Sequence, residues 1–241
     1  MMKKPFSPHP LLDMLLIASI IVLVVILYAK SGKRTNESVI HIVDTKKKIV
    51  ALTFDDGPHP VFTPAIIKIL EKYRVKATFF MVGKQMEKYP GIVKEALGAG
   101  CEIGNHTYSH PRDIEADTDA QIIRELDKCE QIIEKMTGKR AHLFRPPRGM
   151  IDGSVLTIAN EEGYKTILWT VCADHHDAPK PEDMARRVMR RARPGAIILV
   201  HDGMTGMRWR DVPATEEIIR QLQAKGYSFV TISDLLKLSA K

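Results

Sequence analysis

Short apolar runs alternate with helix-like segments through most of this 241-residue chain, and this alternation limits the folds open to it. Each run is bounded by Gly, Pro or polar residues, which is typical of buried strands. Strand–helix alternation predicts an α/β fold with a parallel sheet, and about seven strands suit a barrel-like arrangement. The predicted strands are 49–54, 77–82, 101–104, 142–144, 166–171, 196–200 and 227–231, and the predicted helices are 63–74, 92–97, 118–136, 154–162, 181–191, 214–224 and a short one from 233.

The N-terminal segment predicts a membrane anchor. Two lysines precede an apolar stretch from Leu11 to Ala29, close to the about 20 residues that a spanning helix needs. A basic start before an apolar core also describes a signal peptide, but no clear small-x-small cleavage site follows. We therefore expect a signal anchor or transmembrane segment over 1–30, a tether over 31–46 and the α/β domain over 47–241. That domain would lie outside the cytoplasm at the cell membrane, or be secreted if the segment is cleaved.

The charge of the chain is moderately positive, with a formal value of +7. The basic runs are short and carry no interleaved aromatic residues; they are Lys46 to Lys48 and the pair Arg186 and Arg187. A solvated surface is the simplest interpretation, and affinity for anionic wall polymers or lipid head groups is the alternative. No nucleic-acid-binding module is present in the sequence, so we expect no nucleic-acid partner.

The cysteine count is odd, since the chain has only Cys101, Cys129 and Cys172. Their spacing matches neither a zinc knuckle nor a disulfide framework. Cys129 falls on the apolar stripe of a predicted helix, which favours a buried thiol, and one disulfide among the three is the alternative.

Two adjacent carboxylates, Asp55 and Asp56, follow the first apolar run directly. Like charges at the mouth of an apolar core cost free energy unless something compensates them, and a bound cation would do so. Adjacent residues on an extended chain point in different directions, so the pair can divide two roles. A plain charged turn is the competing interpretation of these two residues.

Two histidines, His106 and His110, lie four residues apart after another predicted strand. On one helical turn they would face the same way and could share an ion. Catalytic zinc sites hold three protein ligands and leave one position open, so one carboxylate of Asp55 and Asp56 would complete the set. The other carboxylate would then be free to act as a base.

Three further side chains fall just after predicted strands. Arg145 is held by a proline-rich turn and would keep a nearby base carboxylate ionised. His201 ends a buried strand and can donate a proton near neutral pH. The acidic cluster from Asp174 to Asp177 would supply an acid that orients His201, or it is a hydrated loop. Because the carboxyl ends of parallel strands meet at one edge, we expect a single site.

Four segments occur in one order that resembles the polysaccharide deacetylases of the NodB-homology family, carbohydrate esterase family 4. These segments are Thr53-Phe54-Asp55-Asp56-Gly57, His106-Thr107-Tyr108-Ser109-His110, Arg145-Pro146-Pro147-Arg148-Gly149 and Leu199-Val200-His201-Asp202. The resemblance covers roughly residues 47–236. It implies a distorted (β/α) barrel with one divalent ion, usually zinc, with cobalt or another divalent ion as alternatives.

The resemblance also implies a role for each residue of the site. Asp56, His106 and His110 would bind the metal, Asp55 would be the general base held by Arg145, and His201 would be the general acid, with Asp174 as its candidate partner. The reaction would be hydrolysis of N-acetyl groups from N-acetylhexosamine residues of a glycan, most simply cell-wall peptidoglycan, with chito-oligosaccharides as the alternative.

The chain departs from the family pattern in two places. The family commonly has an Asp-x-x-Asp-Trp element, and the run from Asp174 to Asp177 lacks the Trp, while another register puts Cys172 at the first acidic position. The sequence therefore leaves open whether Asp174 or Asp177 supports His201. Arg148 stands where many members have an aromatic residue, and it would meet a carboxylate on an acidic glycan.

Two other functions compete with deacetylation. A membrane-tethered barrel that binds wall glycan without turnover would keep the same fold, and the altered acidic element keeps this alternative open. A glycosidase would need carboxyl groups about 5 to 9 Å apart across the scissile bond, for which neighbouring residues at one strand end are poorly placed. The sequence fixes neither the acetylated sugar nor the oligomeric state.

Overall fold

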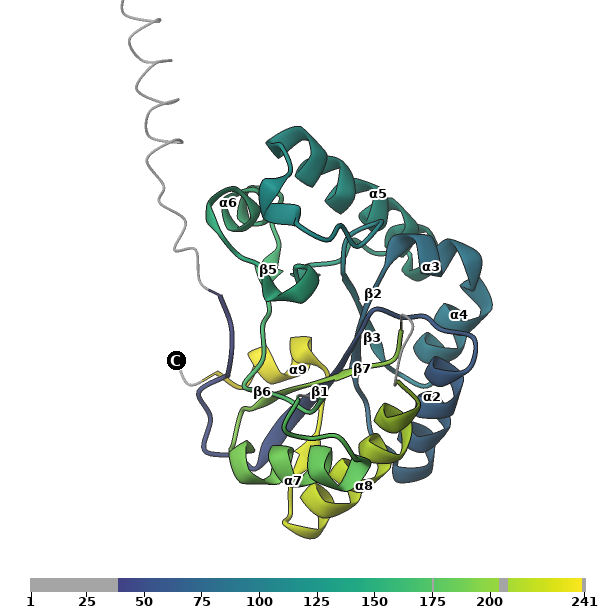
Figure 1. Ribbon diagram of the computed structural model, residues 1–241, viewed down its shortest axis with the longest axis vertical. Helices are drawn as coiled ribbons and strands as arrows, with labels where there is room; N and C mark the ends of the chain where they lie inside the picture. Colours follow the sequence, from purple (N-terminus) through teal and green to yellow (C-terminus); the bar gives the residue numbers. More distant parts are fainter. Residues whose placement is uncertain (1–38, 175, 204–207, 240–241) are drawn as a thin grey trace, which may run out of the picture. The chain divides into compact units, whose positions relative to one another are not determined.

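A parallel sheet organises residues 39–174, 176–203 and 208–239, which the computed structural model describes (Figure 1). Its strands are β1 (Ile49–Asp55), β2 (Thr78–Met81), β3 (Glu102–Asn105), β4 (Leu143–Phe144), β5 (Lys165–Thr166), β6 (Val171–Cys172), β7 (Ile197–His201) and β8 (Ser228–Phe229). They stand in the order β5-β4-β3-β2-β1-β7-β6, with β8 beside the start of β1. All pairings between these strands are parallel, so the predicted α/β architecture with about seven parallel strands is confirmed.

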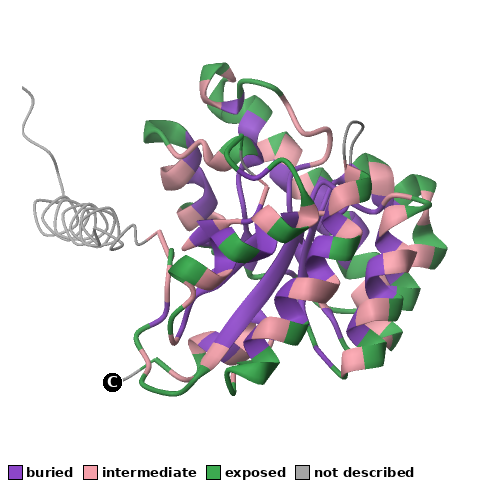
Figure 2. Cartoon of the chain, turned by 60° about the horizontal axis from the view of Figure 1, so that its bottom comes forward, coloured by how far each residue is buried: buried purple, intermediate pink, exposed green. Residues whose placement is uncertain are grey.

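Helices surround this sheet and bury it. The helices are α2 (Phe62–Tyr73), α3 (Gly83–Lys88), α4 (Pro90–Gly98), α5 (Asp119–Thr137), α6 (Gly153–Glu161), α7 (Pro181–Arg191), α8 (Asp211–Ala224) and α9 (Ile232–Leu236), with short 3-10 helices η1 (Ile114–Ala116), η2 (Pro147–Gly149) and η3 (Arg208–Arg210). Strand β1 is buried along almost its whole length, whereas the helices carry exposed residues on their outer faces (Figure 2). Burial on both faces explains why the sequence of β1 is continuously apolar rather than alternating.

The longest helix, α5, begins and ends where the sequence predicts. Thr118 and Gln121 form a capping box at its start. Gly138 ends it with a φ of 71°, a left-handed conformation that glycine adopts without steric cost. Helix α3 was not predicted from the sequence, because six residues are too few to show a helical period.

The predicted single strand over 166–171 is wrong. The segment forms β5 and β6, which lie at opposite edges of the sheet, and the residues between them cross its open side. Ile40 pairs with Ile167 on that side, and the amide of Val43 donates to the carbonyl of Gly195 at 3.0 Å. Part of the segment expected to be a tether therefore hydrogen-bonds to the domain.

The predicted anchor over 1–30 lies outside the described residues, as does the tether up to residue 38. Within the ranges that the structure describes, no helix is long and apolar enough to cross a membrane. The anchor therefore stays a prediction from the sequence.

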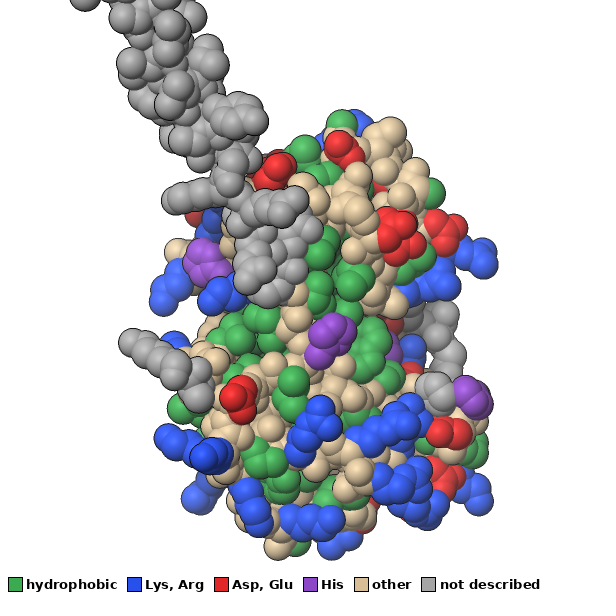
Figure 3. Space-filling model, turned by 90° about the vertical axis from the view of Figure 1, so that its left-hand side faces the viewer, with side chains coloured by type: hydrophobic (Ala, Val, Ile, Leu, Met, Phe, Trp, Pro, Cys, Tyr) green, Lys and Arg blue, Asp and Glu red, His purple; other side chains and the backbone are tan. Residues whose placement is uncertain are grey.

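Positive charge is prominent on the surface, and Lys and Arg side chains predominate in the lower part of the face shown in Figure 3. Lys46 to Lys48 and Arg186 are exposed, as expected for a solvated surface. Arg187 is an exception, because it is buried and its Nη1 binds both carboxylate oxygens of Asp177 at 2.8 and 2.6 Å. This buried arginine fixes the loop before α7 to that helix.

Candidate active site

Side chains from five strand ends converge at the carboxyl edge of the sheet. Asp55 ends β1 and lies directly opposite His201, which ends β7. His106 follows β3, Arg145 follows β4, and Asp174 follows β6 two residues on. Because the strands are parallel, all five positions lie at the same edge, as the sequence predicts.

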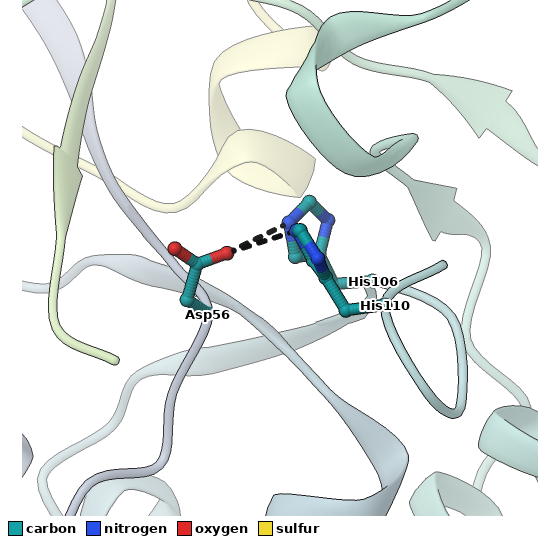
Figure 4. Close-up of side chains that lie close together, drawn as sticks. All are labelled: Asp56, His106 and His110. Carbon is teal, nitrogen blue, oxygen red and sulfur yellow. Dashed lines mark ion pairs between the residues drawn. The ribbon is translucent and has the colours of Figure 1, made fainter. Parts of the chain in front are cut away.

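Asp56, His106 and His110 point toward one another and form a compact ligand set (Figure 4). Asp56 Oδ1 lies 3.4 Å from His106 Nε2 and 3.2 Å from His110 Nε2. Two atoms that bind one zinc ion at about 2.1 Å in tetrahedral geometry lie about 3.4 Å apart. The three side chains therefore fit a tetrahedral metal centre with one open position.

The orientation of His106 also suits a metal ligand. Its Nδ1 lies 2.6 Å from the backbone carbonyl of Arg145, which can only accept, so Nδ1 carries the proton and Nε2 keeps its lone pair for a metal. His106 is almost fully buried. Burial alone lowers the pKa of His106, but the nearby Asp55 and Asp56 carboxylates outweigh it and raise the pKa. Two carboxylates therefore face this ring, and a bound cation would compensate their negative charge.

A tight loop, rather than a helical turn, brings the two histidines together. His106 and His110 lie outside any helix, and Thr107 and His110 have φ values of 66° and 55°. The amide of Thr107 donates to Asn105 Oδ1 at 2.9 Å, and the amide of His110 donates to Thr107 Oγ1 at 3.1 Å. The expected helical placement is wrong, although the expected meeting of the two rings is confirmed.

Asp56 is held in a left-handed conformation with a φ of 76°, which Asp adopts more readily than most residues. This twist, rather than strand alternation, turns its side chain away from that of Asp55. Burial alone raises the pKa of Asp56, but hydrogen bonds from His106 and His110 outweigh it and hold the pKa well below its usual range. A Cβ on Gly203 would overlap the backbone oxygen of Asp56, so this close packing requires glycine there.

Asp55 is gripped by Arg145, which is fully buried. Arg145 Nη1 donates to Asp55 Oδ1 at 2.6 Å and to Thr53 Oγ1 at 2.9 Å, while Nε and Nη2 donate to the carbonyls of Ile167 and Leu168 at 3.0 and 3.1 Å. Asp55 Oδ2 lies 3.9 Å from His106 Nε2, beside the ligand set. One oxygen of Asp55 is therefore fixed, and the other faces the metal-binding atoms.

His201 takes its acidic partner from Asp174. His201 Nδ1 donates to Asp174 Oδ1 at 2.9 Å, while Asp177 binds Arg187 instead. Burial alone lowers the pKa of His201, but the hydrogen bond and charge of Asp174 outweigh it and raise the pKa. The open choice between Asp174 and Asp177 is thus resolved in favour of Asp174, and His201 Nε2 is the nitrogen left to donate a proton.

Several neighbours of this pair were not predicted from the sequence. Arg208 donates to Asp174 Oδ2 through Nη1, and its Nη2 lies 4.0 Å from Asp56 Oδ2. Asp211 accepts from the amide of His201 at 3.3 Å, and burial raises the pKa of Asp211 to about 6. No motif or spacing singles out Arg208 or Asp211, because neither residue belongs to an apolar run or to any of the four segments quoted above.

Asp202 is a second unpredicted acid, directly after His201. It is fully buried, its Oδ2 accepts from Thr63 Oγ1 at 2.6 Å, and its Oδ1 has no partner among the described residues. Burial raises the pKa of Asp202 to about 7. Asp202 closes the fourth of the segments that resemble the family, but no role was predicted for it.

Arg148, the expected contact for an acidic glycan, is exposed on η2. Its Nη1 donates to the carbonyl of Arg112 at 3.1 Å and lies 3.4 Å from Asp113 Oδ1. Both partners are on the chain following the histidine loop, so Arg148 ties that chain to the proline-rich turn.

Comparison with known proteins places this geometry in a family. The family model described as polysaccharide deacetylase matches residues 42–167, more than half of the chain. The chain belongs to the polysaccharide deacetylase family. Its membership confirms the resemblance carried by the four segments.

Relatives of this deacetylase include proteins named as peptidoglycan deacetylases. A peptidoglycan-N-acetylglucosamine deacetylase of Bacillus cereus is 39% identical over 197 residues, which are 81% of this chain and 91% of the relative. A peptidoglycan N-acetylglucosamine deacetylase crystallised with 4-naphthalen-1-yl-N-oxidanyl-benzamide is 34% identical with a TM-score of 0.79, covering 84% of this chain and 94% of that one. A CE4 family pseudoenzyme from Bacillus anthracis is 32% identical with a TM-score of 0.76, and the match covers 85% of this chain and 71% of the pseudoenzyme.

Proposed function

We propose that this chain is a metal-dependent N-deacetylase that removes acetyl groups from N-acetylhexosamine residues of peptidoglycan. The proposal rests on one observation: a second carboxylate, that of Asp55, lies beside the ligand set and is held by an ion pair with Arg145. The ligand set is formed by Asp56, His106 and His110. A hydrolase of this kind needs both an ion and a base beside it.

The residues divide the proton transfers between two sides of the site. Asp55 Oδ2 accepts a proton from the attacking water, while Arg145 fixes the same carboxylate by donating a hydrogen bond to Oδ1. His201 donates a proton to the departing amine, and Asp174 holds its ring with Nδ1 protonated so that Nε2 is the donor. The ion, when bound, polarises the acetyl carbonyl and lowers the pKa of the attacking water.

Zinc is the ion we propose. Two imidazoles and one carboxylate with an open fourth position form a ligand set typical of catalytic zinc, and the 3.2 and 3.4 Å separations support tetrahedral geometry. Cobalt and other divalent ions accept the same ligands, so metal content of the purified chain is the deciding measurement.

Peptidoglycan is the proposed polymer because the relatives described above are named for it and because the N-terminal segment predicts a membrane anchor. An anchored domain outside the cytoplasm would meet cell-wall glycan. Chito-oligosaccharide, which shares the N-acetylglucosamine unit, is the alternative substrate.

Acetate release tests the proposal. Purified peptidoglycan and chito-oligosaccharides would be incubated with the wild-type chain, with and without a chelator, and with Asp55→Asn. We expect acetate release from peptidoglycan only by the wild-type chain without chelator. Zinc added after chelation should restore that release. Chelator-resistant release would contradict the role of the ion, and new reducing ends without acetate would indicate a glycosidase.

A non-catalytic wall-binding protein is the second candidate, because the chain also resembles a pseudoenzyme. This chain keeps a base beside the ligand set and a proton donor opposite the base on the neighbouring strand, which favours catalysis. Glycan binding with metal bound but without acetate release would select the non-catalytic function.

A further inference from the structure

A second group of metal-binding atoms lies beside the active site, on β6 and the end of β7. Atoms of Cys172, Asp174 and His201 all lie within 4.8 Å of one another. Cys172 Sγ donates to Asp174 Oδ1 at 3.0 Å, and His201 Nδ1 donates to the same oxygen at 2.9 Å. One carboxylate oxygen therefore accepts two hydrogen bonds, and both protons stand where a cation could replace them.

We propose that Cys172, Asp174 and His201 form a second divalent-metal site, which takes zinc or another thiophilic ion and inhibits the enzyme. A thiolate, an imidazole and a carboxylate are the three ligand types that zinc prefers. This site is distinct from the one formed by Asp56 and the two histidines of the loop.

The observed separations are close to those that zinc requires. Tetrahedral zinc places a nitrogen and an oxygen ligand about 3.4 Å apart, and a sulfur and an oxygen ligand about 3.6 Å apart. Cys172 Sγ and His201 Nδ1 therefore need to move away from Asp174 Oδ1 by roughly half an ångström, which side-chain rotation can supply. The Asp174 and His201 side chains are 12% and 17% exposed, so an ion can reach them from solvent.

The surrounding charges allow this site but limit its affinity. Arg208 binds Asp174 through Oδ2, which leaves Oδ1 for the ion. The guanidinium of Arg208 would repel the ion. Asp211 is a second carboxylate toward which this guanidinium can shift, since Arg208 Nη1 lies 4.0 Å from Asp211 Oδ1. Burial and the charge of Asp174 raise the pKa of the Cys172 thiol, so an ion has to displace its proton and binding strengthens as pH rises.

Occupancy of this second site would remove the general acid. Once Nδ1 of His201 binds an ion, the ring can no longer be the doubly protonated imidazolium. The proton left on Nε2 would then have to leave an imidazolate behind, which makes the ring far too weak an acid for the proton transfer described above. Excess zinc would therefore inhibit acetate release. This consequence rests on the proposed function, whereas the binding of the ion does not.

Cobalt titration tests the binding directly. Metal-free full-length chain would be titrated with Co²⁺ while its absorption spectrum is recorded, because a thiolate ligand gives a near-ultraviolet charge-transfer band that a site of two imidazoles and a carboxylate lacks. We expect the band to grow with the second equivalent, to vanish in Cys172→Ser and to persist in the matched control Cys101→Ser. Absence of the band, or its survival in Cys172→Ser, would overturn the proposal.

Zinc inhibition tests the consequence. Acetate release would be measured from one equivalent of zinc upward, with each variant normalised to its own activity at one equivalent. Wild type and Cys101→Ser should lose activity as zinc rises, and Cys172→Ser should keep it. Equal inhibition of all three would refute the inhibitory role. If no variant releases acetate at one equivalent, the proposed function fails, and the cobalt band still decides whether the second site exists.

Discussion

Replacing Arg145 by alanine should destabilise the fold through the charge that it leaves behind. The Arg145 side chain is fully buried and donates to Asp55, to Thr53 and to two backbone carbonyls. Its guanidinium also lies 4.1 Å from the centroid of the Phe80 ring. Arg145→Ala thus leaves the buried Asp55 carboxylate without its cationic partner, and it removes the hydrogen-bond donor to the Thr53 hydroxyl and to the two carbonyls.

The expected size follows from that burial. Removing one partner of a buried ion pair costs about 3–5 kcal/mol, mostly because the remaining charge is uncompensated. Asp55→Asn removes that charge, so the double variant Asp55→Asn/Arg145→Ala should be less destabilised than the sum of the two single variants. Contacting residues of this kind couple by about 0.5–3 kcal/mol, and we expect the upper part of that range here.

Urea unfolding of the full chain, followed by tryptophan fluorescence, would measure the four free energies. A chelator in every sample prevents metal binding from contributing. The matched control is the Arg187–Asp177 pair, in which the Asp177 side chain is 47% exposed, so its coupling should be about 1 kcal/mol or less. If the changes in the free energy of unfolding caused by Asp55→Asn and Arg145→Ala are additive, the ion pair between Arg145 and Asp55 does not contribute the expected coupling.

Two further changes test the neighbouring acids. Asp174→Asn should lower kcat by about 10²–10⁴-fold. Because Asp174 raises the pKa of His201, the same variant should move the basic limb of the pH–rate profile to lower pH. The control variant Asp177→Asn should leave the rate near wild type, and equal losses in both variants would contradict the assignment of Asp174 as the partner of His201. Burial raises the pKa of Asp202 to about 7, so the folded chain keeps a proton that the unfolded chain releases. The free energy of unfolding should therefore fall as pH rises from about 4 toward 7, and Asp202→Asn should flatten that fall in urea midpoints; an unchanged slope would refute it.

The strand ends were predictable because each carries a local signal. Apolar runs that stop at Asp55, at His201 or before His106 define the positions, and parallel pairing brings them to one edge. The sequence predicted which side chains meet without predicting how. The left-handed backbone at Asp56 and at Thr107 sets the actual directions of the ligands, and neither residue type signals that conformation by itself.

The rest of the site depends on contacts between distant segments. Arg208 reaches Asp174 across 34 residues, and no periodicity or motif reports that pairing. The apolar run at 166–171 looks like one strand because local pattern cannot show that its two ends pair with opposite edges of the sheet. Arg187 likewise reads as part of a surface run until the position of Asp177 is known.

The most direct measurement compares metal content and acetate release in Asp55→Asn and Asp56→Asn. Each variant would be made in the Cys172→Ser background, so that zinc cannot be held at the proposed second site, then loaded with one equivalent of zinc, dialysed and assayed on peptidoglycan, with Cys172→Ser alone alongside. The account predicts that Asp55→Asn keeps its zinc and releases no acetate, while Asp56→Asn loses both. Acetate release by zinc-free chain, or loss of zinc from Asp55→Asn with retention in Asp56→Asn, would contradict the division of these two carboxylates into base and ligand.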